Sequence, residues 1–266
     1  MYVRKVFFSL LMAYAIQSFI AKPVFGIKKR LQVTHAQRLS KLTLDPLERA
    51  DFLNDGWLHD EALVELEVGN QDDSEVLWRQ ARSIINQGEN LPEDQALEYY
   101  QRALELVELS VEKEPNSPQA QQVLAVACGR VALFKGVFKS IGLVKRVYSA
   151  AHLAIAAGDS MPVSLYILGK THKKLIEKPG FLLKALGLGW VRADSVSYYF
   201  EQAIELSHDN MIQCNYEFAE FQYREYNEKE KAVKLLNRAL ELPLRDEQDK
   251  AAKKKATELL FEINSR

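Results

Sequence analysis

The residues best suited to do chemistry are few and scattered along the chain. It has two cysteines, Cys128 and Cys214, and five histidines, none of which lies four residues from another. Zinc ribbons and thioredoxin-like sites need a Cys-x-x-Cys pair, and helical metal sites often use two histidines one turn apart. Because neither pattern is present, the sequence predicts no metal site. It suggests no arrangement of serine, histidine and acid either, so we expect no cofactor and a protein that is not an enzyme.

One glycine-rich stretch, KPGFLLKALGLGWVRADS at 178–195, invites comparison with a phosphate-binding loop. Its Gly187-x-Gly189 lacks a third glycine at the dinucleotide spacing, and no strand precedes it. We interpret it as a packed insertion, with a short helix from Phe181 to Leu186 and a glycine turn that brings Trp190 onto neighbouring helices. The alternatives are a lid over an apolar groove or an element that touches a membrane, because so many apolar side chains need cover.

The charges of the chain are balanced, with 35 basic and 36 acidic side chains. A nucleic-acid surface normally shows a strong basic excess, so we expect no nucleic acid as a partner. The lysine-rich runs at 173–178 and 253–255 are predicted to be solvated helix faces, and a contact with an acidic partner is their alternative.

The first 26 residues have the organisation of an export signal. Arg4 and Lys5 precede an uncharged run, 6–21, which as a helix is about 24 Å long. That is short for a hydrocarbon core of about 30 Å. We therefore predict a signal peptide or, alternatively, an N-terminal membrane anchor over 1–26, and a basic linker over 27–44. A buried first helix is a third, weaker reading. The protein is expected to be exported, periplasmic or extracellular, if the signal is cleaved, and membrane-anchored otherwise.

From residue 45 onward the pattern predicts an all-α chain. Small and large apolar residues recur at i, i+3, i+4, i+7 and i+8. The copies are Ala96, Tyr99, Tyr100, Ala103, Leu104; then Val196, Tyr199, Phe200, Ala203, Ile204; then Ala232, Leu235, Leu236, Ala239, Leu240. A weaker copy begins at Ala62, 34 residues before Ala96, and this is the tetratricopeptide period. Small residues let neighbouring helices approach closely, so we predict a tetratricopeptide-like α-solenoid over 45–266, with about five helix pairs and a C-terminal capping helix.

The first helix of each pair lines the inner wall of such a solenoid. Aligning the pairs on their small residues predicts eight side chains on this wall: Trp78, Arg82, Gln122, Tyr166, Lys170, Lys173, Tyr216 and Glu220. This mixture predicts a groove for a peptide or protein partner, extended or helical, with some acidic character. The alternative is a lipid-binding or membrane-tethering solenoid, with membrane or lipid contact through 6–21 or 181–190.

The solenoid also predicts the state of the remaining reactive side chains. Packed helices 8–10 Å apart would hold Cys128 and Cys214 well beyond the disulfide separation of about 5.5 Å, so we expect buried free thiols. His172 takes a place usually given to a large aromatic residue. We expect it to be half-buried and hydrogen-bonded.

Several segments, in order, carry a resemblance to a known family. They include SEVLWRQAR, ALEYYQRALEL, FKSIGLVKRVYSAAHLAI, SLYILGKTH and ALGLGWVRADSVSYYFEQAIEL. Over roughly residues 50–263, the chain resembles the regulator of microtubule dynamics family of tetratricopeptide proteins, whose third and fourth repeats are also long. The resemblance implies a non-enzymatic, all-helical interaction protein, and animal members are associated with microtubules and membrane contact sites. The chain departs from the family pattern at Thr171–Lys173 and before Ser195, where the family favours aromatic residues and proline.

Overall fold

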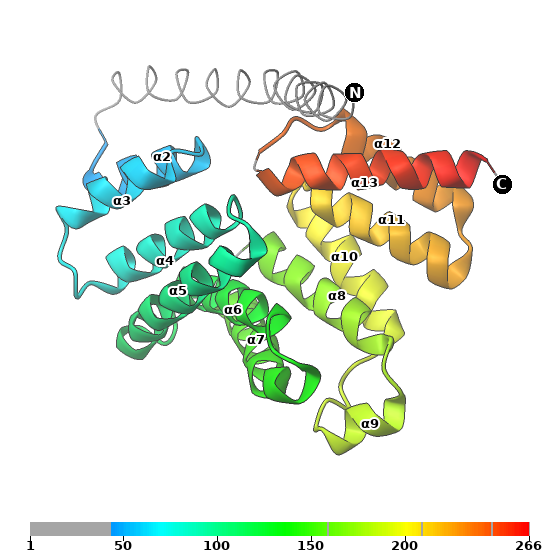
Figure 1. Ribbon diagram of the computed structural model, residues 1–266, viewed down its shortest axis with the longest axis horizontal. Helices are drawn as coiled ribbons and strands as arrows, with labels where there is room; N and C mark the ends of the chain where they lie inside the picture. The colour runs from blue at the N-terminus through cyan, green and yellow to red at the C-terminus, as the bar shows by residue number, and fades with distance from the viewer. Residues whose placement is uncertain (1–43, 159, 209, 246, 266) are drawn as a thin grey trace, which may run out of the picture.

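The fold is entirely helical over the residues that the computed structural model describes, which are 44–158, 160–208, 210–245 and 247–265 (Figure 1). The predicted signal peptide or anchor over 1–26, and the linker up to residue 43, lie outside this part of the chain. No helix in the described part is long and apolar enough to cross a membrane.

The described helices form five antiparallel pairs and a final capping helix, in the order that the sequence predicts. The pairs are α2 (Pro46–Asp55) with α3 (His59–Glu67), α4 (Ser74–Gly88) with α5 (Glu93–Lys113), α6 (Pro118–Leu133) with α7 (Val137–Ala157), α8 (Pro162–Ile176) with α10 (Ala193–Leu206), and α11 (Ile212–Tyr226) with α12 (Lys229–Glu241). The short helix α9 (Gly180–Ala185) belongs to the insertion, and α13 (Glu247–Asn264) covers the last pair.

Local capping sets where these helices begin. The Asp45 carboxylate accepts the backbone N–H groups of Leu47 and Glu48, both at 2.9 Å, and the Glu48 carboxylate accepts the Asp45 N–H at 3.1 Å. Pro46 follows as the first helical residue, where its missing N–H costs nothing. Ser117 caps α6 in a similar way and is also followed by proline. The first helix after 45 therefore starts where the sequence predicts.

Small side chains at the helix crossings make the close packing possible. Ala62, Ala103, Ala203 and Ala239 are fully buried, as the repeated pattern predicts. At the crossing of α8 and α10, a Cβ built on Gly169 would lie 2.9 Å from Cδ1 of Phe200, whose ring is itself fully buried. The backbone of α8 therefore rests directly on an aromatic ring, which only glycine permits without a shift of its neighbours.

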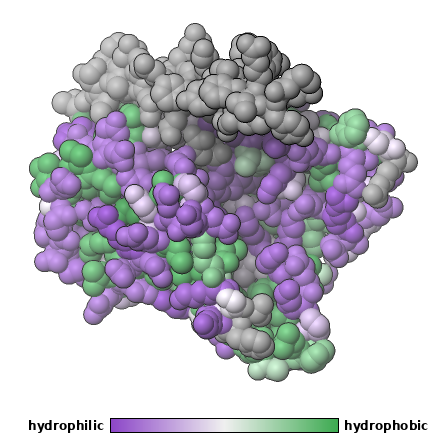
Figure 2. Space-filling view, viewed as in Figure 1, coloured by the Kyte–Doolittle hydropathy of each residue, from purple (hydrophilic) through white to green (hydrophobic). Residues whose placement is uncertain are grey.

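The insertion at 178–192 contains the predicted short helix and glycine turn. Gly187 has φ of 71°, in the region that favours glycine, and the turn brings Trp190 to 3.9 Å from the ring centroid of Tyr148 on α7. Trp190 also meets His172 of α8 edge-on, at 5.2 Å between ring centroids. Leu183 and Leu188 of the insertion are buried, but Phe181 stays 78% exposed, and Figure 2 shows apolar side chains gathered at this end of the molecule.

Cys128 and Cys214 are both fully buried thiols that form no disulfide, as predicted. His172 is more deeply buried than predicted, since only 2% of its surface is exposed. Lys173 corrects the prediction of a solvated face for 173–178, because its ammonium group pairs with carboxylates of α11 across the solenoid.

Candidate functional site

A cavity of about 1250 Å³ is bounded by the first helices of four successive pairs. Its lining comes from α4, α6, α8 and α11, together with the turn between α2 and α3 and the start of α13. This is the side that the repeat pattern predicts for the inner wall. The part of the chain that the structure describes contains no group of three or more side chains suited to hold a metal ion.

The floor of the cavity is apolar and comes mainly from α6, α7 and α8. Val126 of α6 and Ile167 of α8 line it and are partly exposed, and α7 contributes Val144 and Val147. Leu133, at the end of α6, is 67% exposed and extends the apolar floor toward the rim. Such a surface removes apolar groups of a ligand from water, which is the main favourable term in most protein association.

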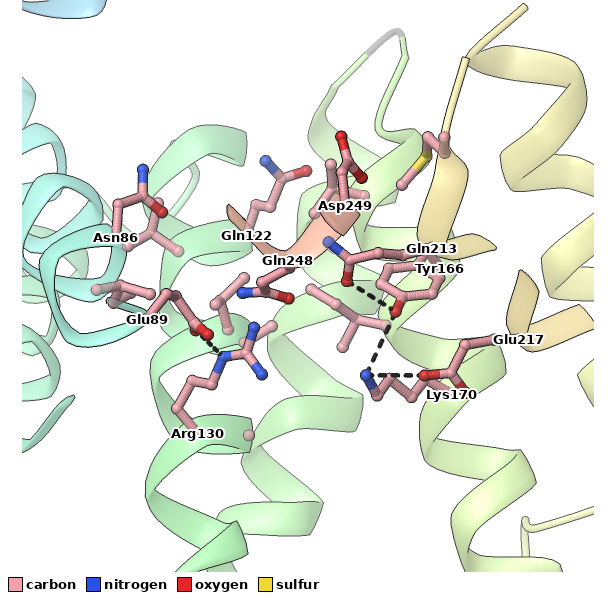
Figure 3. A pocket seen from close by; sticks show the side chains of 18 of the residues that line it. Asn86, Glu89, Gln122, Arg130, Tyr166, Lys170, Gln213, Glu217, Gln248 and Asp249 are labelled. Atoms are coloured by element: carbon pink, nitrogen blue, oxygen red, sulfur yellow. Dashed lines mark hydrogen bonds and ion pairs between the residues drawn. The ribbon is translucent and has the colours of Figure 1, made fainter. Parts of the chain in front are cut away.

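One wall carries a charged network between α8 and α11, visible in Figure 3. The Lys170 ammonium lies 3.0 Å from a carboxylate oxygen of Glu217, and Lys173 lies 2.8 Å from the other oxygen and 2.6 Å from Glu220. Tyr166 continues the network: its hydroxyl accepts from Lys170 and donates to Gln213 (Figure 3). Across the cavity, Arg130 of α6 pairs with Glu89, the residue directly after α4, at 2.5 Å.

These contacts shift the pKa values of the charged side chains. Burial alone would raise the pKa of Glu217, but Lys170 and Lys173 outweigh it and hold that pKa below its usual value. Burial likewise opposes the charge of Lys173, and Glu217 and Glu220 more than compensate, so its pKa is raised. Both groups therefore keep their charges at neutral pH, and the network is an internal set of ion pairs.

Six of the eight predicted wall residues line the cavity: Arg82, Gln122, Tyr166, Lys170, Lys173 and Glu220. The structure brings Tyr166, Lys170, Lys173 and Glu220 together. Gln122 lies on the neighbouring helix α6, where its amide oxygen accepts the Ser164 hydroxyl of α8 at 3.3 Å. Arg82 lies at the far end of the cavity and pairs with Asp51 of α2.

Trp78 and Tyr216 do not line the cavity, which corrects their predicted position. Trp78 is buried in the core, and the guanidinium groups of Arg79 and Arg82 lie over its ring at 4.1 and 5.3 Å. Tyr216 packs toward α12 and α13, and its hydroxyl donates to Glu220 at 3.0 Å. The apolar stripe of a helix is over 100° wide. The register of the small residues therefore does not tell which side chains of the stripe face the cavity and which pack against the neighbouring helices.

Sequence reasoning missed several lining residues. Glu217 is four residues from Gln213 and three from Glu220, so the helical period could have found it on the same face. Trp57 and Arg245 also line the cavity, but they are 188 residues apart and no local pattern relates them.

Acidic and basic side chains are equally frequent in the lining, and most pair with one another. The cavity therefore presents apolar surface and amide groups to a ligand, with little net charge. The amides include those of Asn86, Gln122, Gln213 and Gln248 (Figure 3).

Comparisons with known proteins match nearly the whole described part of the chain. The family model for Regulator of microtubule dynamics protein 1-3 matches residues 47–264. Regulator of microtubule dynamics protein 1 of Bos taurus is 22% identical over 252 residues, which cover 91% of this chain and 79% of the relative. Among solved structures, a thermophilic tetratricopeptide protein of Thermus thermophilus is similar, with a TM-score of 0.57 at 19% identity. That likeness covers 80% of this chain and 97% of the other, and it shows a tetratricopeptide-like fold.

Proposed function

Because this chain belongs to the regulator of microtubule dynamics family, we propose that it is a non-enzymatic scaffold that binds a peptide or protein segment in the cavity of its solenoid. Helical-repeat proteins use extended concave surfaces of this kind to bind other chains. The observation that carries the proposal is the cavity itself, with an apolar floor on α6 and α8 between two polar walls.

The composition of the lining favours an amphipathic segment with few charges. An apolar stripe on a helical or extended peptide would cover Val126 and Ile167, and its polar edges would reach the amides of Gln122 and Gln213. The sequence alone predicted a ligand with some acidic character. Since Lys170 and Lys173 are already paired with Glu217, the lining gives an acidic peptide no unpaired lysine at this position.

A peptide-library selection against the full chain tests the proposal. Selected peptides are expected to be amphipathic and to bind in a fluorescence anisotropy titration. Val126→Asp places a charge on the apolar floor and should weaken this binding at least about tenfold, since a buried unpaired carboxylate is costly. Tyr198→Ala changes a side chain on α10 that is 59% exposed and outside the cavity lining, so it is the matched control. Equal binding by both variants would remove the cavity as the binding site.

Contact with a membrane surface is a second candidate function, favoured by the exposed tip of the insertion. Phe181 protrudes there between the exposed lysines Lys178 and Lys184. Apolar groups flanked by basic ones bind the interface of anionic bilayers. Sedimentation with phosphatidylserine vesicles should then fall for Phe181→Glu, and an unchanged bound fraction would exclude the tip as a membrane contact.

Regulation of microtubules is a third candidate, which follows from the name of the bovine relative. It requires a chain that faces the cytoplasm, whereas residues 1–26 favour export or a membrane anchor. Mass spectrometry of the mature N-terminus separates these locations. Recovery of Met1 would exclude signal cleavage, and co-sedimentation with microtubules would then be the test.

A further inference from the structure

The two ends of the solenoid meet at one side chain. Trp57, in the turn between α2 and α3, donates its indole N–H to the backbone carbonyl of Arg245, just before α13. The ammonium group of Lys250, on the first turns of α13, lies 5.0 Å from the centroid of the same ring. We call these three residues, Trp57, Arg245 and Lys250, the clasp.

Both halves of the clasp are held in place by their own surroundings. The Arg245 backbone N–H donates to Asp249 at 2.8 Å, and its guanidinium donates to the carbonyl of Asn210 at 2.8 Å. Trp57 is only 6% exposed, and its φ is 65°. A bulky residue rarely adopts this backbone conformation, and it persists only where the surrounding structure enforces it. Strain of this kind gathers at functional sites, so the conformation of Trp57 calls for an explanation.

The clasp is narrow, and it lies at the cavity. In the described chain neither α2 nor α3 packs along α11, α12 or α13, so the two ends of the solenoid share no broad interface. Trp57, Arg245 and Asp249 all line the cavity, together with residues of the walls described above. Figure 1 shows the α2–α3 turn and the start of α13 on the same side of the molecule.

We propose that the clasp holds the two ends of the solenoid together and controls entry to the cavity. Breaking it would let the first helix pair move away from α13 while α2 and α3 stay packed on α4. The inference rests on the proposed function, because control of entry matters only if the cavity takes up a ligand. A ligand that binds the open form would then gain access in proportion to the fraction of molecules that are open.

The distance between the two ends tests the clasp without any ligand. Val64 on α3 and Phe261 on α13 are 61% and 75% exposed, so cysteines introduced there accept spectroscopic labels, whereas Cys128 and Cys214 are buried. Trp57→Phe keeps an aromatic ring and removes the indole donor. Loss of one ordinary hydrogen bond should raise the ratio of open to closed molecules about fivefold, seen as a longer-distance population.

Trp78→Phe is the matched control, because the Trp78 indole N–H is buried and has no acceptor among the described residues. Lys250→Met is the second variant, which acts from the other side of the clasp and leaves the packing of Trp57 intact. It keeps the test decisive if Trp57→Phe fails to fold. A distance distribution that stays unchanged in a folded clasp variant, or that widens equally in Trp78→Phe, would overturn the proposal.

Entry to the cavity is measured with the anionic dye 8-anilinonaphthalene-1-sulfonate, whose aromatic rings bind apolar surfaces, counting only the signal that Val126→Asp abolishes. In Trp57→Phe, the association rate of the dye should rise by up to the factor by which the fraction of open molecules rises. Longer distances with an unchanged association rate would overturn the role of the clasp in access. Failure of the peptide selection would contradict the proposed function and leave the clasp untouched, because the distance measurement needs no peptide.

Discussion

At the scale of single residues, His172 shows how the insertion is tied to the solenoid. Its Nδ1 accepts the backbone N–H of Arg192 at 3.1 Å, and the rings of Tyr148, Trp190 and Tyr199 surround it. Its Nε2 is buried and has no partner in the described chain. Because Nδ1 accepts this bond, the neutral ring carries its hydrogen on Nε2, and protonation would add a second hydrogen at Nδ1, facing the Arg192 N–H. It would also place a charge among aromatic rings, and burial lowers the pKa of His172 to about 4.

This histidine should make the fold sensitive to mild acid. The unfolded chain binds a proton at this position below pH 6.5, and the folded chain does so only near pH 4. The unfolded state thus binds more protons in this window, so stability falls as the pH drops through it, by up to about 3 kcal/mol. His172→Asn keeps an acceptor for Arg192 and cannot titrate. Urea unfolding at pH 7 and pH 4.5 should show a smaller loss for the variant, and equal losses would contradict this origin.

The two cysteines should be inert while the protein is folded. Both are fully buried, and burial raises the pKa of the Cys128 thiol to about 11. Since the thiolate is the reactive species, an aromatic disulfide reagent at pH 8 should label neither thiol in the native protein. Both should react once the chain is denatured without reductant. Labelling of a folded thiol, or a missing thiol after denaturation, would contradict the buried, reduced state.

The types and spacing of the residues predicted much of the candidate site. The rest could not be predicted, because the sequence does not specify the direction of each side chain. Tyr166, Lys170 and Lys173 follow one another at helical spacing, so the sequence places them on one face of α8. Their partner Glu217 lies 44 residues beyond Lys173, and only the stacking of α8 on α11 brings them together. Trp78 was misplaced because a large aromatic residue at the edge of a stripe can turn into the core or into the groove.

At the scale of helices, close approach depends on the few positions that have no Cβ. Gly169 and Gly129 both lie inside first helices, but their surroundings differ. A Cβ on Gly169 would meet the buried ring of Phe200 at 2.9 Å, whereas one on Gly129 would lie 3.8 Å from Val147, an ordinary contact distance.

These glycines should respond oppositely to the same substitution. Alanine improves helix propensity by about 1 kcal/mol at either site. At Gly169 the overpacking cost should exceed this gain, so that Gly169→Ala destabilises the protein by about 1 kcal/mol. Gly129→Ala should stabilise it by up to about 1 kcal/mol. Chemical denaturation measures both, and stabilisation by Gly169→Ala would show that Phe200 can move.

The helices themselves were predictable because caps and small residues are local signals. Pro46 begins α2 and Ser117 caps α6 at the places where proline and serine stand in the sequence. The insertion was predictable as a helix and glycine turn for the same reason. The stacking of Trp190 on Tyr148 follows from the path of the chain over α7, and sequence spacing does not specify that path.

At the scale of the whole molecule, α13 has two roles. Its buried face, which includes Leu259 and Ile263, covers the apolar surface that α11 and α12 would otherwise leave open. Its first turns carry Lys250 to the ring of Trp57 at the other end of the chain. A solenoid normally transmits changes only between neighbouring repeats. The clasp adds a direct connection between the first pair and the last helix, so the molecule should behave as a closed ring.

Hydrogen exchange in a cap variant distinguishes a ring from an open rod. Leu259→Asp buries a carboxylate among apolar side chains and should cost at least about 3 kcal/mol, whereas Phe261→Asp on the exposed face of α13 should cost within about 0.5 kcal/mol. In an open rod, faster exchange would spread from α13 to α11 and α12 and fade toward the middle of the chain. In a ring, loosening α13 also frees Arg245 and Lys250 from Trp57. The α2–α3 turn should then exchange faster while α6, between the two ends, keeps its protection. Exchange that fades steadily from α13 to α2 would contradict the ring and leave an ordinary solenoid.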